Sequence, residues 1–317
     1  MRKLEMRKLA GVAVFTVATA LVPAFVTSGA VLNAVILTLY AVLLGQAWNV
    51  LGGYGGQFSF GHAVFFGTGG YAMAVLQIRY GLSAWLAMPL AIGAGAAVGA
   101  LVGSLTFRYG LRGSYFALVT LAFAEVFRIL ANTFAFTGAG VGLMLPLADA
   151  PAQLQFSSRA GYLYLILGFV LAGFAVHLWL GHSRFGARLT AVRDNEASAS
   201  ALGVNVFRVK LGAIMISGAL MAAGGVFYIQ YLHYLDPVIA YGPAVSVEAL
   251  LVPIVGGMGT LFGPLLGAVA LHALSEGTRN LFGDAPGISL ALYGTVLIVM
   301  VRYMPRGLIG LFDRRGP

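Results

Sequence analysis

The chain contains no cysteine and very few charged residues. Without cysteine, disulfide scaffolds, thiolate metal sites and cysteine nucleophiles are excluded. Charged residues make up 9% of the 317 positions and hydrophobic residues 60%, whereas about a quarter of a soluble domain is charged. This composition is typical of a polytopic membrane protein. The formal net charge of +9 does not indicate nucleic acid, because basic residues of membrane proteins gather on cytoplasmic loops.

Long stretches carry no charge at all. None occurs between Leu9 and Ile78, and about 20 apolar residues suffice for one helix to cross a bilayer, so this stretch predicts about three spans. We expect an all-α polytopic membrane protein, one integral membrane domain over residues 1–317, with eight clear transmembrane helices plus a broken or re-entrant helical pair. The spans are expected at about 9–27, 31–50, 62–78, 84–107, 113–131, 161–181, 211–232 and 288–303.

Basic residues indicate the orientation in the membrane. With the basic N-terminus inside, alternation places the 132–160 loop outside, the 184–210 loop inside and both termini in the cytoplasm. A cleaved signal peptide is disfavoured, because the first apolar stretch exceeds the roughly 7 to 15 residues of such a segment. Arg79 is an exception, because it falls outside. The basic residues expected inside, beyond those of the 184–210 loop, are Arg2, Lys3, Arg7, Lys8, Arg108, Arg112, Arg302, Arg306, Arg314 and Arg315.

Glycine clusters predict two breaks in the helices. Residues 49–75 hold eight glycines among the polar side chains of Asn49, Gln57, Ser59 and His62. Irregular backbone at membrane depth persists only where protein or a water-lined cavity satisfies it, so these four residues are candidates for lining a translocation path. The alternative is close packing of helices through small residues.

The second cluster lies in "SVEALLVPIVGGMGTLFGPLLGAVALHAL", at Gly256, Gly257 and Gly259. Residues 243–276 are either a re-entrant hairpin or two tilted crossings. Glu248 begins this pair and is a candidate for orienting it. Its glycine spacing is similar to that of the first cluster, which suggests an internal structural repeat. Transport sites often lie between such repeats.

Few ionisable residues lie within the expected spans, and ionisable residues inside a membrane are candidates for functional residues. Glu125 and Arg128 are three positions apart on one predicted helix and so share a face. An ion pair that neutralises both is favoured over direct contact with a substrate. The histidines are scattered singly, so no metal site is expected.

Lysine is also scarce, which bears on ATP use. A P-loop needs lysine followed by serine or threonine, and Lys3, Lys8 and Lys210 are each followed by leucine. Nucleophile-elbow, zincin and paired-carboxylate patterns are missing too. The chain is therefore not expected to be an enzyme or to bind a cofactor of its own.

The most charged loop is "RFGARLTAVRDNEASASALGVNVFRVK", residues 184–210, within a segment at about 182–210. Asp194 as N-cap, Glu196 in the first turn and Gly203 as a stop predict a short helix over 195–202. Either the loop is solvated and its arginines set orientation, or it docks on another protein. The apolar residues expected to serve docking are Ala197, Ala201 and Leu202, with a stripe of Phe185, Leu189 and Val192 before them.

Five motifs resemble, in order, the signatures of the membrane-spanning subunits of branched-chain amino acid ABC importers, of the LivM type. They are "WNVLGGYGGQFSFGHAVFFGTGGYA", "LRGSYFALVTLAFAEVFRI", "TGAGVGL", "AVRDNEASASALGVNVFRVKL" and "SVEALLVPIVGGMGTLFGPLLGA", and the likeness covers about residues 31–303. The resemblance implies a bacterial inner-membrane permease with a second related permease, two ATPase subunits that use the ATP, and an extracytoplasmic binding protein as partners, besides membrane lipid. It also implies that Arg193 to Lys210 form the segment that couples to the ATPase, with Arg193, Asp194, Asn195, Glu196 and Gly203 in it.

The resemblance leaves the substrate open between hydrophobic amino acids and urea or short amides. Two rivals from other classes remain. A secondary transporter or channel acting alone would use Glu125 or Glu248 and an ion gradient, and a membrane scaffold would bind partners without any flux.

Overall fold

The computed structural model describes residues 2–26, 28–148, 150–282, 294–295, 298, 302, 304 and 306–311. Within these ranges the chain is built almost entirely of helices. The α-helices are α1 (Arg2–Phe25), α2 (Gly29–Trp48), α3 (Ala63–Tyr80), α4 (Ala84–Arg108), α5 (Gly113–Thr133), α6 (Arg159–His182), α7 (Arg184–Asp194), α8 (Glu196–Ala201), α9 (Val206–Leu232), α10 (Pro237–Tyr241), α11 (Pro243–Gly256) and α12 (Gly263–Phe282).

Short elements join these helices. A π-helix, η1 (Asn49–Tyr54), continues α2, and 3-10 turns occupy η2 (Ala135–Thr137), η3 (Ala139–Val141), η4 (Pro151–Gln153) and η5 (Leu308–Leu311). The strands β1 (Leu143–Met144) and β2 (Tyr234–Leu235) form one antiparallel pair in which Leu143 faces Leu235.

Seven helical segments of the described chain are long and apolar enough to cross a membrane. They are Met6–Phe25, Gly29–Tyr54, Ala84–Arg108, Gly113–Thr133, Arg159–His182, Val206–Leu232 and Pro237–Gly256. The all-α polytopic fold is confirmed, but the predicted count of eight clear spans is not. The expected span at 62–78 forms α3, whose glycines and polar residues keep it out of this set. The expected span at 288–303 lies largely outside the described residues.

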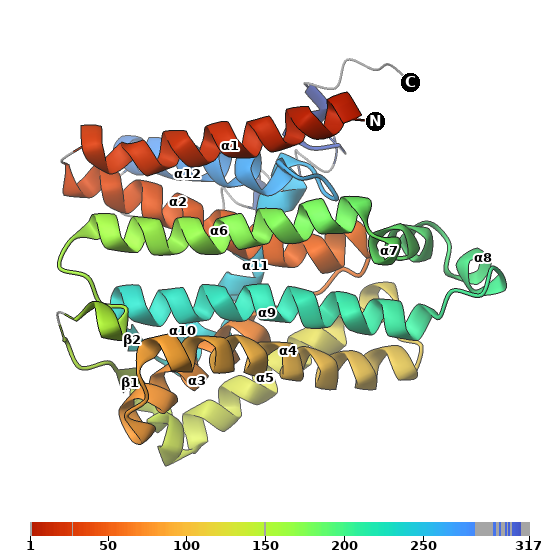
Figure 1. The fold of residues 1–317 in the computed structure, drawn as a ribbon. Helices are drawn as coiled ribbons and strands as arrows, with labels where there is room; N and C mark the ends of the chain where they lie inside the picture. Colours follow the sequence, from red (N-terminus) through yellow and green to blue (C-terminus); the bar gives the residue numbers. More distant parts are fainter. Residues whose placement is uncertain are drawn as a thin grey trace.

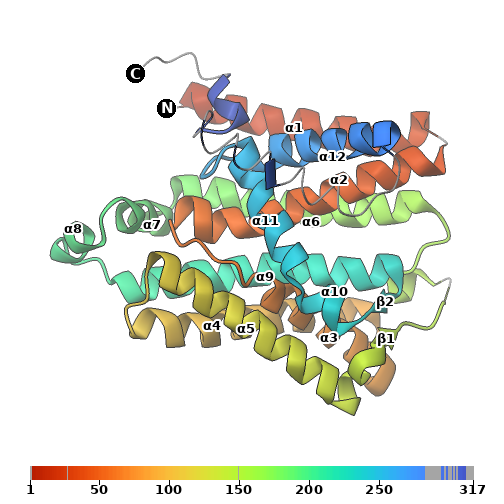
Figure 2. The same ribbon diagram turned by 180° about the vertical axis from the view of Figure 1, so that it is seen from behind.

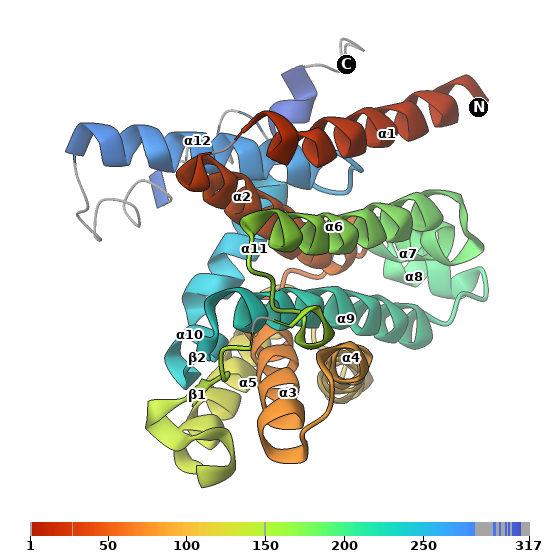
Figure 3. The same ribbon diagram turned by 60° about the vertical axis from the view of Figure 1, so that its left-hand side comes forward.

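The helices stack from one side of the molecule to the other (Figure 1). The first group is α1, α12 and α2, the middle is formed by α6 and α9, and α3, α4 and α5 lie on the far side. Figure 3 shows the same order, with α3, α4 and α5 on the side away from α1 and α12. Of the seven segments, the one that includes α9 is the most buried, which places the core around this helix.

Glycines let α9 approach its neighbours closely. A Cβ at Gly225 would lie 2.0 Å from the carbonyl oxygen of Phe66 on α3, and one at Gly99 on α4 would lie 2.8 Å from that of Ile214. Because no side chain fits there, packing through small residues accounts for these glycines.

The two ends of the bundle differ (Figures 1 and 2). One end carries α7, α8 and the start of α1, and we call it the α7–α8 end. The opposite end carries α10 and the β1–β2 pair. The N-terminus and the charged segment thus share an end, as the alternation of spans predicts. Their assignment to the cytoplasmic side stays a prediction from the basic residues.

Candidate functional site

Side-chain caps divide the charged segment into three helices. The Ser183 hydroxyl accepts from the Gly186 amide at 3.0 Å and begins α7. Asn195 begins α8, because its side-chain oxygen accepts from the Ser198 amide at 2.9 Å. Asn205 caps α9 in the same way. Each cap satisfies a backbone donor that the helix leaves free.

The predicted N-cap is off by one position. Asp194 does not cap α8; it is the last residue of α7, and its carboxylate accepts from Arg193 Nε at 3.1 Å. Asn195 instead has the extended backbone of a cap residue, with φ of −160° and ψ of 109°. Gly203 does follow the end of α8, with φ of +83°, a left-handed conformation that glycine adopts freely.

Glu196 turns toward the bundle. Its carboxylate binds the ammonium of Lys210 on α9 and pairs with Arg112 at 3.0 Å, just before α5. The Lys210 side chain is 4% exposed and its Nζ lies 5.5 Å from the centre of the Phe107 ring. Glu196 therefore fixes α8 to two membrane helices.

The apolar residues expected to serve docking separate into two groups. Leu189 and Val192 are buried, and the ring of Phe185 stacks on Trp179 at 5.5 Å, so this stripe packs against the chain's own bundle. The expectation that it docks is wrong, because α7 folds back onto α6 and α9. On α8 and just after it, Ala197, Ala201 and Leu202 are exposed, Leu202 at 85%.

Arg193 links α7 to the interior. Its Nη1 donates to the carbonyl of Gly53 in η1 at 3.2 Å, and the same nitrogen lies 3.3 Å from where a Cβ on Gly259 would be. Gly259 lies in the turn between α11 and α12, and its φ of +70° is one that glycine adopts without strain. The end of α7 thus touches both predicted breaks.

Asn49 joins the same two breaks deeper in the bundle. Its side-chain oxygen accepts from the Gly259 amide at 2.8 Å, and its Nδ2 donates to the Thr260 carbonyl at 3.0 Å. Nδ2 also lies 3.1 Å from His177 Nε2 on α6. Because His177 Nδ1 donates to the Gly173 carbonyl at 2.8 Å, Nε2 is free to accept. Asn49 therefore holds α2, α6 and the α11–α12 turn together.

The other residues predicted for the path surround the stretch between η1 and α3. His62 Nε2 donates to the Ser217 hydroxyl at 2.9 Å, and that hydroxyl donates to the Ala47 carbonyl at 2.7 Å. Ser59 accepts the indole N–H of Trp48 on its carbonyl at 2.9 Å. Gln57 donates to the Gly55 carbonyl at 3.3 Å. All are buried, so they shape the interior of this chain.

Glu125 and Arg128 form an ion pair on α5. Arg128 donates from Nε at 2.8 Å and from Nη2 at 2.5 Å, one bond to each carboxylate oxygen. The pair lies on the outer face of the helix, where the Glu125 side chain is 52% exposed and that of Arg128 31%. The structure therefore separates this pair from the buried polar residues around Asn49.

The second glycine cluster forms a tight turn. The α11 helix ends at Gly256 and α12 begins at Gly263, and a Cβ at Gly256 would lie 1.7 Å from the Gly263 carbonyl oxygen. Glu248 lies on α11 and is half-buried. The helix thus breaks at the glycines that predict a break, while a role in gating stays a prediction.

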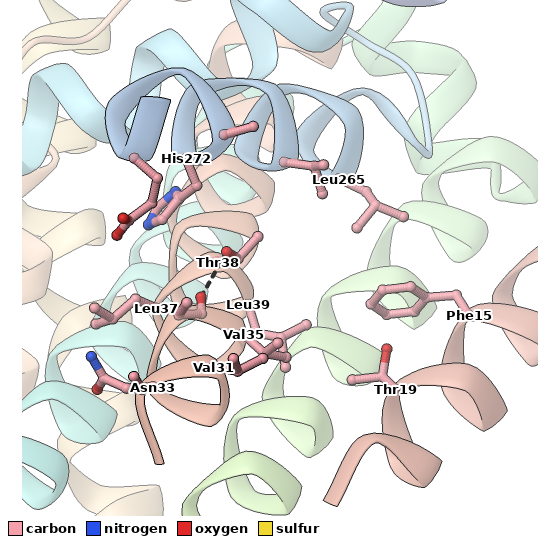
Figure 4. Close-up of a pocket in the computed structure, with 15 residues that line it drawn as sticks. Phe15, Thr19, Val31, Asn33, Val35, Leu37, Thr38, Leu39, Leu265 and His272 are labelled. Carbon is pink, nitrogen blue, oxygen red and sulfur yellow. Dashed lines mark hydrogen bonds between the residues drawn. The ribbon is translucent and has the colours of Figure 1, made fainter. Parts of the chain in front are cut away.

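A groove of about 790 Å³ opens between α1, α2 and α12 (Figure 4). Aliphatic side chains line most of it, with His272 at the α12 wall. None of Asn49, Gln57, Ser59 and His62 lines this groove. In the part of the chain that the structure describes, no three His, Asp or Glu side chains gather as metal ligands.

Sequence reasoning missed the partners of the predicted residues. His177 and Thr260 complete the Asn49 contacts, Ser217 binds His62, and Lys210 binds Glu196. A local signal exists only for Lys210, a lone lysine at the start of an apolar run. The others are unremarkable in sequence, and distance along the chain hides their contacts.

Comparison with known proteins identifies the class. Residues 30–301 match the family described as "Branched-chain amino acid transport system / permease component". The chain belongs to this family of membrane permeases, and its likeness to the LivM type is confirmed.

Three relatives illustrate how similar this chain is to known permeases. The "High-affinity branched-chain amino acid transport system permease protein LivM" of Salmonella typhimurium is 31% identical, over 90% of this chain and 71% of the relative. The LivM protein of Escherichia coli is 30% identical with the same coverage. The ribose import permease protein RbsC of Escherichia coli is 24% identical over 74% of this chain and 72% of the relative. No solved structure matches.

Proposed function

We propose that this chain is the permease subunit of an ATP-driven importer for branched-chain amino acids, moving its substrate by alternating access. Its partners are then two ATPase subunits, a second related permease and an extracytoplasmic binding protein. The family match and the LivM relatives support the substrate class. The ribose permease relative makes a sugar the competing substrate, but its identity and coverage are lower.

The observation that carries the coupling role is the construction of the α7–α8 end. One side of α8 is exposed at Ala197, Ala201 and Leu202, while its other side is held to α9 by Glu196 and Lys210. A protein that binds the exposed side can therefore displace a membrane helix. Arg193 provides a second connection, to the η1 break.

Alternating access then follows from the hydrogen bonds that connect the two irregular segments, η1 and the α11–α12 turn. Asn49 ties η1 to the α11–α12 turn, and Arg193 ties η1 to α7. A shift of α7 on nucleotide binding would change the relative position of two irregular segments at membrane depth. Such segments are where transporters bind and release substrate.

The test is to purify the tagged full chain from its host in mild detergent and identify its partners, beside Leu202→Asp. We expect an ATPase pair and a second permease with the unmodified chain, and loss of the ATPases alone in the variant. Leu147→Asp is the matched control, because Leu147 is 77% exposed at the opposite end. A chain that emerges alone and passes leucine in ATP-free liposomes would instead be a secondary transporter.

A further inference from the structure

Glu125 lies near the middle of α5, a helix long and apolar enough to cross a membrane, and Arg128 lies about one turn nearer the end of that helix. Glu125 is 12 residues after Gly113, the start of α5, and 8 before Thr133, its end. At about 1.5 Å per residue, its Cα is about 18 Å from one end of the helix and 12 Å from the other. Lipid headgroups do not reach this depth, since the hydrocarbon layer is about 30 Å thick.

The pair points away from this chain's own bundle. The α5 helix lies at the edge of the molecule away from α1 (Figures 1 and 2), and Glu125 is exposed whereas Thr120 and Ala124 of the same helix are buried. Charged side chains at mid-membrane depth face protein or a water-filled cavity, not lipid. Something other than lipid therefore covers this face in the assembled transporter.

The stretch between η1 and α3 packs against the bundle-facing side of α5. The stretch between η1 and α3 runs beside α5 (Figure 2), and a Cβ at Gly61 would lie 1.9 Å from the Thr120 carbonyl oxygen. Thr120 is about 7.5 Å along the helix from Glu125. In this stretch Phe58 and Phe60 are each 42% exposed, whereas Gln57 and Ser59, which alternate with them, are buried. Two exposed aromatic rings thus lie on the stretch that packs beside α5.

The pair has unused binding capacity. Its two hydrogen bonds use one lone pair on each Glu125 oxygen and two of the five N–H donors of Arg128. The remaining acceptors suit an ammonium group, and the remaining donors, those of Nη1 among them, suit a carboxylate. A free amino acid carries both groups on adjacent atoms.

We propose that this face of α5 meets the second permease across the translocation path, and that Glu125 and Arg128 bind the ammonium and carboxylate groups of an amino-acid substrate passing through it. The site rests on the proposed importer function and specifies where the zwitterion is recognised. Hydrophobic side-chain preference then comes from apolar groups separate from the charged pair, and the exposed rings of Phe58 and Phe60 are the candidates for this role.

The experiment uses the complete complex in proteoliposomes, with ATP and leucine as the probe. Glu125→Gln with Arg128→Gln removes both charges and leaves none unpaired, so the complex should assemble while leucine uptake falls about tenfold or more, the change expected on losing a charge-assisted hydrogen bond. Glu125→Arg with Arg128→Glu restores an ion pair but exchanges its ends. This swap should assemble normally and still fail to restore uptake.

The matched control is Leu101→Ala on α4, which is 49% exposed and lies outside the proposed face, and it should change uptake by no more than about twofold. A merely structural ion pair predicts that the swapped variant transports as the wild type does, and this result would overturn the site alone. A wild-type complex that imports ribose but no amino acid would overturn the site together with the proposed substrate.

Discussion

Lys210 and Glu196 are 14 positions apart in sequence, and their charged groups join the second turn of α9 to the first residue of α8. The Lys210 side chain is almost fully buried, and that of Glu196 is 15% exposed. A buried charge is tolerated only when it is paired and hydrogen-bonded. The contact therefore both stabilises the α7–α8 end and makes α8 move with α9.

Removing one partner of the Glu196–Lys210 ion pair should destabilise the protein. Glu196→Gln leaves the buried Lys210 ammonium without its counter-charge, and the loss of stability should be about 3 kcal/mol. The measurement is the melting temperature of the purified complex in detergent. The second variant, Glu196→Gln with Lys210→Met, should recover most of this stability because no buried charge remains. If the double variant melts as low as the single one, the pair is not the cause.

Asn49 holds two breaks together, so Asn49→Ala should slow transport. The variant loses the bonds to Gly259 and Thr260 and should destabilise the protein by about 2 kcal/mol. A positioning role lowers the maximal uptake rate and leaves KM for leucine unchanged, whereas a residue of the path would raise KM. Thr38→Val is the control, because among the described residues the Thr38 hydroxyl donates to the Ala34 carbonyl of its own helix and to no other helix. If the variant's uptake kinetics are unchanged, Asn49 neither positions the two breaks nor lines the path.

The α11–α12 turn should not accept a methyl group. In Gly256→Ala the new Cβ would lie 1.7 Å from the Gly263 carbonyl oxygen, so the backbone must move at a cost of about 1 to 3 kcal/mol. Gly93→Ala on α4 is the matched control, since nothing lies within 4 Å of its Cβ. There alanine should stabilise the helix by about 0.5 to 1 kcal/mol. Melting temperatures that move in the same direction would contradict this account.

Local sequence features predict local structure well in this chain. Apolar runs fix most helices, and Gly203 and Gly256 mark two helix ends. The cap of α8 is misplaced because Asp and Asn are about equally good caps. Because Leu189 and Val192 pack against the bundle, α7 stays helical through Asp194. The cap position therefore falls on Asn195.

Contacts distant in sequence were beyond prediction. Asn49 and Gly259 are 210 positions apart, and no periodicity or spacing relates them. The outward direction of Glu125 and Arg128 was equally hidden, because spacing places two side chains on one face without saying where that face points. Both facts depend on how whole helices pack, which is what the structure adds.

Arg193 provides a separate test of coupling. Its Nη1 donates to the Gly53 carbonyl, and its Nε and Nη2 donate to Asp194. Arg193→Met removes the connection from α7 to η1 but leaves α8 and its exposed residues in place. The ATPases should therefore remain bound and hydrolyse ATP, while leucine uptake falls by about tenfold or more.

Asp194→Asn is the control for this variant. It weakens only the exposed pair with Arg193, in which Asp194 is 65% exposed, and such pairs contribute less than about 1 kcal/mol. The bond to Gly53 stays, so ATPase activity and uptake should both remain near those of the wild type. Uptake that is lost equally in both variants would show that the surface of α7, and not its contact with η1, carries the coupling. Loss of bound ATPase in Arg193→Met would lead to the same conclusion.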